Sequence, residues 1–196
     1  MKKRVGTVKR DTTETRIDIE LAVDGSGEND IETGIPFFDH MLTLFAKHGL
    51  FDLKIQATGD INVDAHHTVE DVGICLGKAF QEALADKKGI NRYGFALVPM
   101  DESLSLVALD ISGRPYLEYD VDMPVEVIGT FDTPLVEEYL QALCNNTGMT
   151  LHVKMLNGKN THHMIEAVFK GLGKALDMAT MIDPRVKDIP STKGRL

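Results

Sequence analysis

Two short segments of this 196-residue chain combine adjacent histidines with a glutamate four residues after the first of them. The residues concerned are His66, His67 and Glu70 in the first segment and His162, His163 and Glu166 in the second. Residues three and four apart lie on one face of a helix, so each glutamate can reach the same ion as one of its histidines. Adjacent residues differ by about 100° around a helix axis, so each pair is suited to touch two different ions. Nitrogen and carboxylate ligands without thiolate suit manganese, iron, cobalt or zinc.

The two segments belong to a longer internal repeat. They lie 96 residues apart, and eight of the 14 positions counted from each first histidine are identical. A single copy could equally be the start of a surface helix with a first-turn acid favoured by the helix dipole. A repeat that served only the core would keep its apolar positions, whereas this one also keeps the histidines and the glutamate. The repeat therefore favours a two-metal site, to which a histidine from elsewhere, such as His40, could contribute.

The surrounding residues predict the elements that position these segments. Each segment follows an apolar helix and then a strand, at residues 36–48 and 51–56 in the first half and 134–145 and 150–154 in the second. Alternating stretches predict further strands upstream, at residues 15–23, 104–111 and 116–121. Apolar residues at helical spacing give each histidine helix a buried stripe. We expect an α+β chain of two repeats, residues 1–91 and 92–196, with two sheets and the helices packed between them.

Composition limits the partners of the chain. A formal net charge of −9 argues against a nucleic-acid or anionic-membrane surface. An anionic substrate would therefore need a local basic cluster, and Arg and Lys are the usual partners of phosphate. The candidates are Arg92, Arg114, Lys170 and, in the tail, Lys193 with the hydroxyl of Ser191. Taken singly, each is more often a solvated surface residue, and sequence spacing does not show that they converge.

For the two cysteines and the two remaining histidines, the sequence favours structural roles. Cys75 and Cys144 lie in apolar, helix-like stretches. Without a secretory leader or a long apolar span, we expect a cytoplasmic protein with reduced, buried thiols. His48 precedes a glycine at an expected helix end, and His152 falls within an alternating strand.

Ordered motifs along nearly the whole chain closely resemble the imidazoleglycerol-phosphate dehydratase family. They are RxTxET at 10–15, GIPFFDHML at 34–42, DxHHTVED at 64–71, NRYG at 91–94, SGRP at 112–115, NxHHxxEA at 160–167 and PSxKG at 190–194. The resemblance implies a duplicated fold similar to the second domain of ribosomal protein S5. It also implies a homo-oligomer of 24 subunits, with two Mn2+ ions per active site and sites completed by neighbouring subunits.

The resemblance assigns roles to individual residues. The implied metal ligands are His40, His66, His67, Glu70, His162, His163 and Glu166. The implied phosphate and substrate contacts are Arg92, Arg114, Lys170, Ser191 and Lys193. Glu14 matches the substrate-binding acid of the family. Glu138 departs from the family pattern, because some members have a further histidine ligand there, although a carboxylate can also bind manganese.

The implied reaction is that of a metal-dependent hydro-lyase of histidine biosynthesis. Water is eliminated from imidazoleglycerol phosphate to give imidazole acetol phosphate, although no carbonyl makes the departing proton acidic. A metal on the imidazole nitrogen can favour an imidazolate that expels hydroxide through the ring, and a second can hold the hydroxyls. Glu14 can move protons as a general acid or base. The phosphate, remote from the reacting atoms, provides binding energy for orientation.

Two other classes of function fit parts of the sequence. The run Gly171-Leu172-Gly173-Lys174 faintly resembles the Gly-rich phosphate loop of a GHMP-like phosphotransferase on the same fold, but it lies inside a helix repeat and lacks a serine run. A non-enzymatic, S5-like nucleic-acid-binding module is opposed by the net charge and the paired histidines.

Overall fold

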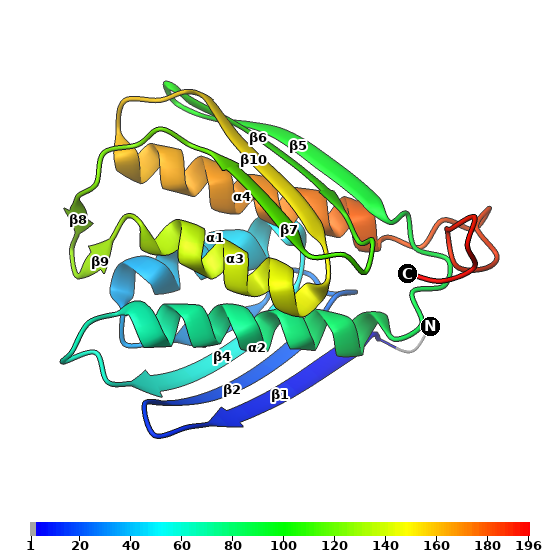
Figure 1. The fold of residues 1–196 in the computed structure, drawn as a ribbon, viewed down its shortest axis with the longest axis horizontal. Coiled ribbons are helices and arrows are strands. Elements are labelled where there is room, and N and C mark those ends of the chain that lie inside the picture. The colour runs from blue at the N-terminus through cyan, green and yellow to red at the C-terminus, as the bar shows by residue number, and fades with distance from the viewer. Residues whose placement is uncertain (1–2) are drawn as a thin grey trace.

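Two four-stranded sheets enclose four helices in the computed structural model, which describes residues 3–196 (Figure 1). The first half supplies β1 (Val5–Asp11), β2 (Thr15–Ala22), β3 (Asn29–Glu32), α1 (Pro36–Gly49), β4 (Asp52–Gly59) and α2 (His66–Leu84). The second half supplies β5 (Tyr93–Met100), β6 (Ser103–Asp110), β7 (Tyr116–Asp120), α3 (Leu135–Thr147), β10 (Thr150–Asn157) and α4 (Thr161–Thr180). A short hairpin of β8 (Val127–Ile128) and β9 (Phe131–Asp132) lies between β7 and α3.

The two sheets have the same strand order. One is β1-β2-β4-β3 and the other is β5-β6-β10-β7. In each, three strands are antiparallel, and the last strand pairs in parallel with the strand that precedes the histidine helix. The expected α+β class, with two sheets and helices between them, is confirmed.

The helices pack crosswise between the two halves of the chain. α1 lies against α4 and α2 against α3, while α2 also covers β1 and β2 and α4 covers β5 and β6. The close approach of α4 to α1 requires glycine, because a Cβ on Gly173 would lie 2.5 Å from the backbone oxygen of Phe45. A Cβ on Gly171 would lie 2.8 Å from Val107 in β6. The glycines of the GLGK run are therefore packing positions within α4, which agrees with the prediction that the run lies inside a helix rather than in a phosphate loop.

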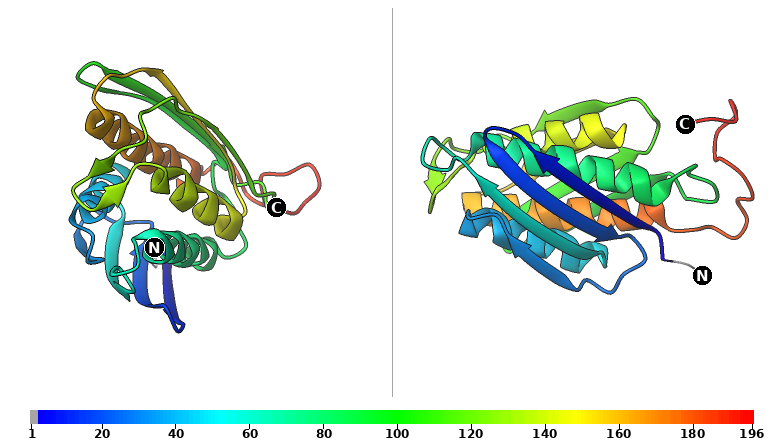
Figure 2. Two further views of the ribbon diagram at one scale, coloured as in Figure 1. Left: turned by 60° about the vertical axis from the view of Figure 1, so that its left-hand side comes forward. Right: turned by 90° about the horizontal axis from the view of Figure 1, so that it is seen from below.

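All four helices begin at the same end of the molecule, and the C-terminal tail lies at the opposite end (Figures 1 and 2). Consequently the first turns of the helices can combine their side chains. The candidate residues near these starts are His40 on α1, His66 and His67 on α2, Glu138 on α3 and His162 and His163 on α4.

The two cysteines, and the two histidines outside the adjacent pairs and His40, lie where the sequence predicts. Cys75 and Cys144 are free and buried, and burial raises the pKa of the Cys75 thiol to about 11, so it stays protonated at neutral pH. His48 is in the last turn of α1 and His152 is in β10. Within residues 3–196, none of the helices combines the length and apolarity needed to cross a membrane.

Candidate active site

Three candidate metal ligands meet where α1 packs on α4. His40 Nε2 lies 2.9 Å from Glu166 Oε1, and His162 Nε2 lies 3.1 Å from the same oxygen. One ligand atom of each residue lies within 4.8 Å of the other two. The crosswise helix packing thus joins a histidine of the first half to two residues of the second. Two imidazole nitrogens and a carboxylate oxygen form a donor set for a divalent transition metal.

The carboxylate at the centre of this cluster stays ionised. Glu166 is buried, which alone would raise its pKa, but hydrogen bonds from Lys170, His40 and His162 outweigh burial and hold the pKa at about 2. Lys170 Nζ donates to Glu166 Oε2 at 2.7 Å and lies 3.2 Å from Met100 Sδ. Lys170, expected to contact phosphate, therefore stands beside the candidate metal ligands.

The second histidine of each pair is held by a carboxylate from a loop. His67 Nδ1 lies 3.0 Å from Asp60 Oδ2, and His163 Nδ1 lies 2.9 Å from Glu102 Oε2. These hydrogen bonds raise the pKa of both imidazoles. In the neutral rings, Nδ1–H donates to the carboxylate and Nε2 keeps its lone pair. Metal-ligating histidines commonly have this arrangement, which the sequence analysis missed because Asp60 and Glu102 follow no recognisable spacing.

The two imidazoles of each pair face different directions. The ring planes of His66 and His67 meet at 86°, and those of His162 and His163 meet at 88°. The same geometry therefore occurs twice, as expected for adjacent residues on a helix that approach two different ions.

Among residues 3–196, the corresponding residues of the first repeat do not form such a cluster. His66 and Glu70 are half-buried on α2, and α3 packs against α2 as α1 packs against α4. Glu138 is aligned with His40 in the repeat, but it is exposed on the first turn of α3 and lies outside the three-residue cluster.

Glu14 lies between β1 and β2, beside the first histidine pair. Its Oε1 is 4.0 Å from His67 Nε2, and 54% of its side chain is exposed. The carboxylate is thus close to a candidate metal ligand and accessible to a bound small molecule.

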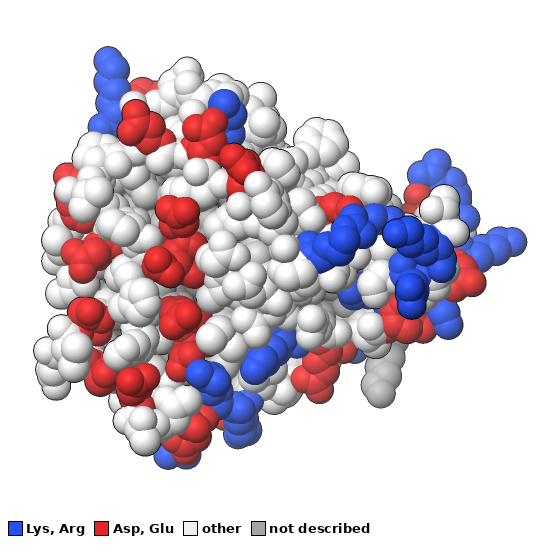
Figure 3. Space-filling model, in the orientation of Figure 1, with Lys and Arg blue, Asp and Glu red and all other residues white. Residues whose placement is uncertain are grey.

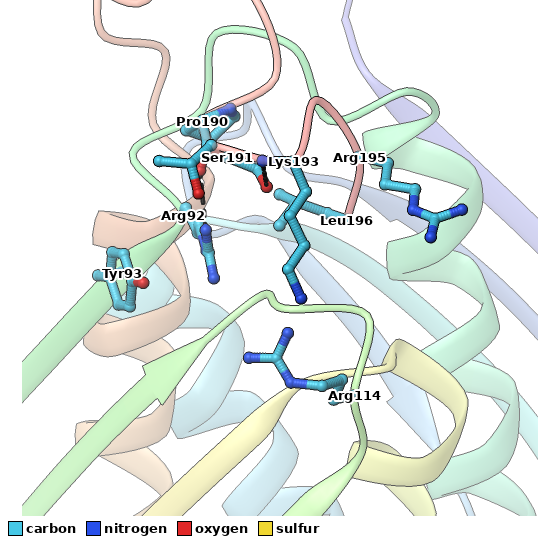
Figure 4. A pocket seen from close by; sticks show the side chains of 9 residues that line it. Arg92, Tyr93, Arg114, Pro190, Ser191, Lys193, Arg195 and Leu196 are labelled. Atoms are coloured by element: carbon cyan, nitrogen blue, oxygen red, sulfur yellow. Dashed lines mark hydrogen bonds between the residues drawn. The ribbon is translucent and has the colours of Figure 1, made fainter.

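Four of the five predicted phosphate contacts line a pocket of about 760 Å³ at the other end of the molecule. They are Arg92, Arg114, Ser191 and Lys193. In Figure 4, the side chains of Arg114 and Lys193 point toward one another across the pocket, whereas Arg195 points away. The basic residues of the tail and of the β6–β7 loop therefore converge, which their sequence spacing did not show.

Arg92 both anchors the tail and contributes to this pocket. Its Nε and Nη2 donate to the Asp110 carboxylate at 2.6 and 3.0 Å, and its Nη1 donates to the Pro190 carbonyl at 2.8 Å. Three of its five N–H groups are therefore used within the protein, and two are left for an anion. The guanidinium also stacks on Tyr93, 4.8 Å from the ring centroid.

The metal-ligand cluster and the basic pocket are far apart within one chain. The cluster lies at the start of α4 and the pocket-lining tail follows its end, and a 20-residue helix spans about 30 Å. In the space-filling view, acidic side chains gather over the end where the helices begin, and basic ones gather around the tail (Figure 3). A single small phosphorylated molecule cannot reach both groups on one copy.

Comparisons with known proteins identify the family of the chain. The family model for imidazoleglycerol-phosphate dehydratase matches residues 33–176. The chain is 58% identical over 193 residues to the imidazoleglycerol-phosphate dehydratase of Pelobacter propionicus, covering 98% of this chain and 99% of the relative. It is 61% identical to that of Caldanaerobacter subterraneus subsp. tengcongensis, covering 98% and 100%.

Solved structures show the same fold. The crystal structure of imidazoleglycerol-phosphate dehydratase from Staphylococcus aureus has a TM-score of 0.83 at 41% identity, covering 91% of this chain and 99% of that one. The enzyme from Pyrococcus furiosus, solved in complex with (S)-C348, has a TM-score of 0.84 at 40% identity, covering 96% and 100%.

The family match identifies a lyase, whose fold carries a candidate metal centre and a separate basic pocket. The chain belongs to the imidazoleglycerol-phosphate dehydratase family. The predicted family and enzyme class, a dehydratase of histidine biosynthesis, are confirmed.

Proposed function

We propose that the protein dehydrates imidazoleglycerol phosphate to imidazole acetol phosphate at metal-dependent sites shared between copies of the chain. The observation that carries this proposal is the cluster of His40, His162 and Glu166, whose ligand atoms lie within 4.8 Å of one another. The basic pocket at the far end of the chain supports a phosphorylated substrate.

Two Mn2+ ions per site suit the donors that the chain offers. The closed cluster would hold one ion. His67 and His163 would contribute through Nε2, because their Nδ1 atoms are occupied by Asp60 and Glu102. The first repeat would add His66 and Glu70, with Glu138 as a further carboxylate donor. When bound, the ions supply Lewis acidity toward the imidazole ring and the substrate hydroxyls.

Protein side chains would carry out the proton transfer and the orientation of the substrate. Glu14 would take the proton from the carbon beside the imidazole, since its exposed carboxylate lies next to His67. Arg114, Lys193 and Ser191 would bind the phosphate, and Arg92 would complete this contact while holding the tail. Fixing the phosphate orients the reacting carbons without taking part in bond cleavage.

In a shared site, the acidic end of one copy would meet the basic end of another. The acidic end carries the metal ligands and Lys170, whereas the basic end carries the phosphate pocket (Figure 3). Opposite charges on the two ends favour contact between copies. The outer face of β5 also presents Tyr93, Phe95 and Leu97, with exposed fractions of 58%, 63% and 56%. Exposed apolar side chains in a row are typical of an interface and support a homo-oligomer, for which we propose 24 subunits.

We also propose a cytoplasmic location for this reaction. Two buried thiols that remain unpaired are consistent with a reducing compartment.

Metal removal tests the proposed function. After EDTA treatment, conversion of imidazoleglycerol phosphate should cease and the large assembly should dissociate in size-exclusion chromatography, because binding energy at a shared site is also assembly energy. Adding Mn2+ should restore both. Full activity in a preparation that elemental analysis shows to be metal-free would refute the proposal.

A further inference from the structure

An ion pair between the half-buried Arg10 and the buried Asp71 ties the turn that carries Glu14 to the helix that carries the first histidine pair. Arg10 Nη2 of β1 lies 2.9 Å from Asp71 Oδ1 of α2. Thr15 Oγ1 donates to the other oxygen of this carboxylate, Asp71 Oδ2, at 2.5 Å. Asp71 and Thr15 are buried, with 6% and 3% of their surface exposed. Both oxygens of a carboxylate hidden from water are therefore partnered by the β1–β2 hairpin.

The network continues from Thr15 into the turn. Thr12 Oγ1 accepts hydrogen bonds from the backbone N–H groups of Glu14 and Thr15 at 3.1 and 2.9 Å. The carbonyl oxygen of Glu14 accepts from the backbone N–H of Asp60 at 3.1 Å. The backbone of Glu14 is thus held on both sides, and its side chain extends toward His67.

The second repeat builds the same junction without the ion pair. β5 and β6 pair in the same register as β1 and β2, shifted by 88 residues, and the histidine helices correspond with a shift of 96. The corresponding pairs are Arg10 and Val98, Glu14 and Glu102, Thr15 and Ser103, and Asp71 and Ala167. Val98 and Ala167 are both buried. At the two positions of the ion pair, a hairpin of this register therefore packs on a histidine helix through apolar residues.

The second repeat indicates that the hairpin does not need this ion pair for its stable packing on the helix. Removing an ion pair from water costs free energy, and well-packed apolar replacements are often neutral or stabilising. The glutamates in the turns of the two hairpins, Glu14 and Glu102, differ in their hydrogen bonding. The carboxylate of Glu102 accepts hydrogen bonds from His163 Nδ1 and from the backbone N–H groups of Lys159 and Asn160. Glu14 makes no such bonds among residues 3–196, and its carboxylate stays available beside His67.

We propose that Arg10, Asp71 and Thr15 are positioning residues that hold the Glu14 carboxylate at its working place beside His67. This inference rests on the proposed proton-transfer role of Glu14. The ion pair fixes the hairpin against the first turns of α2, and the two threonine hydroxyls transmit that fixation to the Glu14 backbone.

The double variant Arg10→Val/Asp71→Ala tests the inference, because it places the residues of the second repeat in the first. In the Mn2+-supplied enzyme, its kcat should fall by about 10-fold or more, since a catalytic group displaced by about 1 Å can cost 10²-fold. KM, assembly and Tm should stay near those of the parent. Hydrogen exchange of the peptide spanning residues 11–17 should become faster. Lys9→Val/Asp18→Ala, which removes an exposed ion pair of the same hairpin, is the matched control.

A double-mutant cycle with Glu14→Gln distinguishes positioning from a general loss of structure. If the network acts through Glu14, the double variant should lower kcat by less than about 2-fold in the Glu14→Gln background. An undiminished effect there, or an unchanged kcat in the parent background, would overturn the inference. Should the double variant fail to fold, Thr15→Val removes only the hydroxyl and takes its place in the cycle. Full activity of Glu14→Gln would instead refute the proposed role of Glu14 itself.

Discussion

The carboxylate behind His163 offers a sharp test of the proposed metal centre. Glu102 accepts hydrogen bonds from His163 Nδ1 at 2.9 Å, from Asn160 N at 2.8 Å and from Lys159 N at 3.2 Å. In Glu102→Gln the remaining carbonyl oxygen can keep the backbone bonds, but the new amide NH2 faces the Nδ1–H donor of His163. Two donors cannot pair, so the imidazole must rotate or move its proton to Nε2, the nitrogen needed for the metal.

The expected loss is about 10- to 100-fold in Mn2+ affinity, the usual effect of removing the carboxylate partner of a metal-ligating histidine. Competition with a fluorescent chelator measures this affinity, and kcat at saturating Mn2+ should recover in part. Asp60→Asn should give a similar loss through His67. Asp101→Asn is the control, because Asp101 is 73% exposed and 4.0 Å from His163. Native Mn2+ affinity in a folded Glu102→Gln protein would refute the role assigned to His163.

Two further predictions address the tail and the buried glutamate. Deleting residues 191–196 removes Ser191 and Lys193 but keeps the Arg92–Pro190 contact. KM should rise by about 10-fold or more because charged hydrogen bonds to the substrate are lost, whereas Tm should be nearly unchanged. A large fall in Tm would show that the tail is structural, and Arg195→Ala is the control. In metal-free protein, the lowered pKa of Glu166 contributes stability that is fully present above about pH 4.5 and is lost as the pH falls toward 2. Over this window, Tm should therefore fall more steeply in the parent than in Glu166→Gln. Parallel curves of Tm against pH would contradict this.

The parts of the site that follow from local periodicity could be predicted from the sequence. The spacing of His162 and Glu166 places them on one helix face, and their atoms lie 3.1 Å apart. The contact of His40 with Glu166 joins residues 126 positions apart, so it depends on how α1 packs on α4. His40 was named as a possible contributor from elsewhere in the chain and was implied as a ligand by the resemblance to a family, but no spacing rule places it in this cluster.

Residues contributed by loops were harder to predict. Asp60 and Glu102 are acidic residues without a periodic context, and only the folded chain brings them to His67 and His163. Lys170 was grouped with the phosphate contacts, but its position one helical turn beyond Glu166 directs its ammonium group to that carboxylate. Sequence motifs identify which residues carry charge, and the topology determines which of them meet.

The edge strands β1 and β5 were missed for a physical reason. The burial of β1 alternates, but its inward positions include Gly6 and Arg10, so its sequence lacks the apolar alternation of a half-buried strand. β5 exposes Tyr93, Phe95 and Leu97 while burying Ala96 and Val98, so both faces are apolar and the alternation disappears. If the proposed oligomer covers the outer face of β5, this pattern is that of a strand buried on both sides.

The duplication explains how one scaffold can carry two chemically different half-sites. Crosswise packing gives each histidine helix a partner helix from the other half, so neither repeat can place its ligands alone. Divergence then lies in side chains that the fold does not require: His40 against Glu138, Arg10 with Asp71 against Val98 with Ala167, and Glu14 against Glu102. Among residues 3–196, Glu102 supports His163 through a hydrogen bond, whereas the carboxylate of Glu14 lies beside His67 without one. The helix starts and the basic tail lie at opposite ends of one chain, so the proposed sharing of sites between copies would make catalysis depend on assembly.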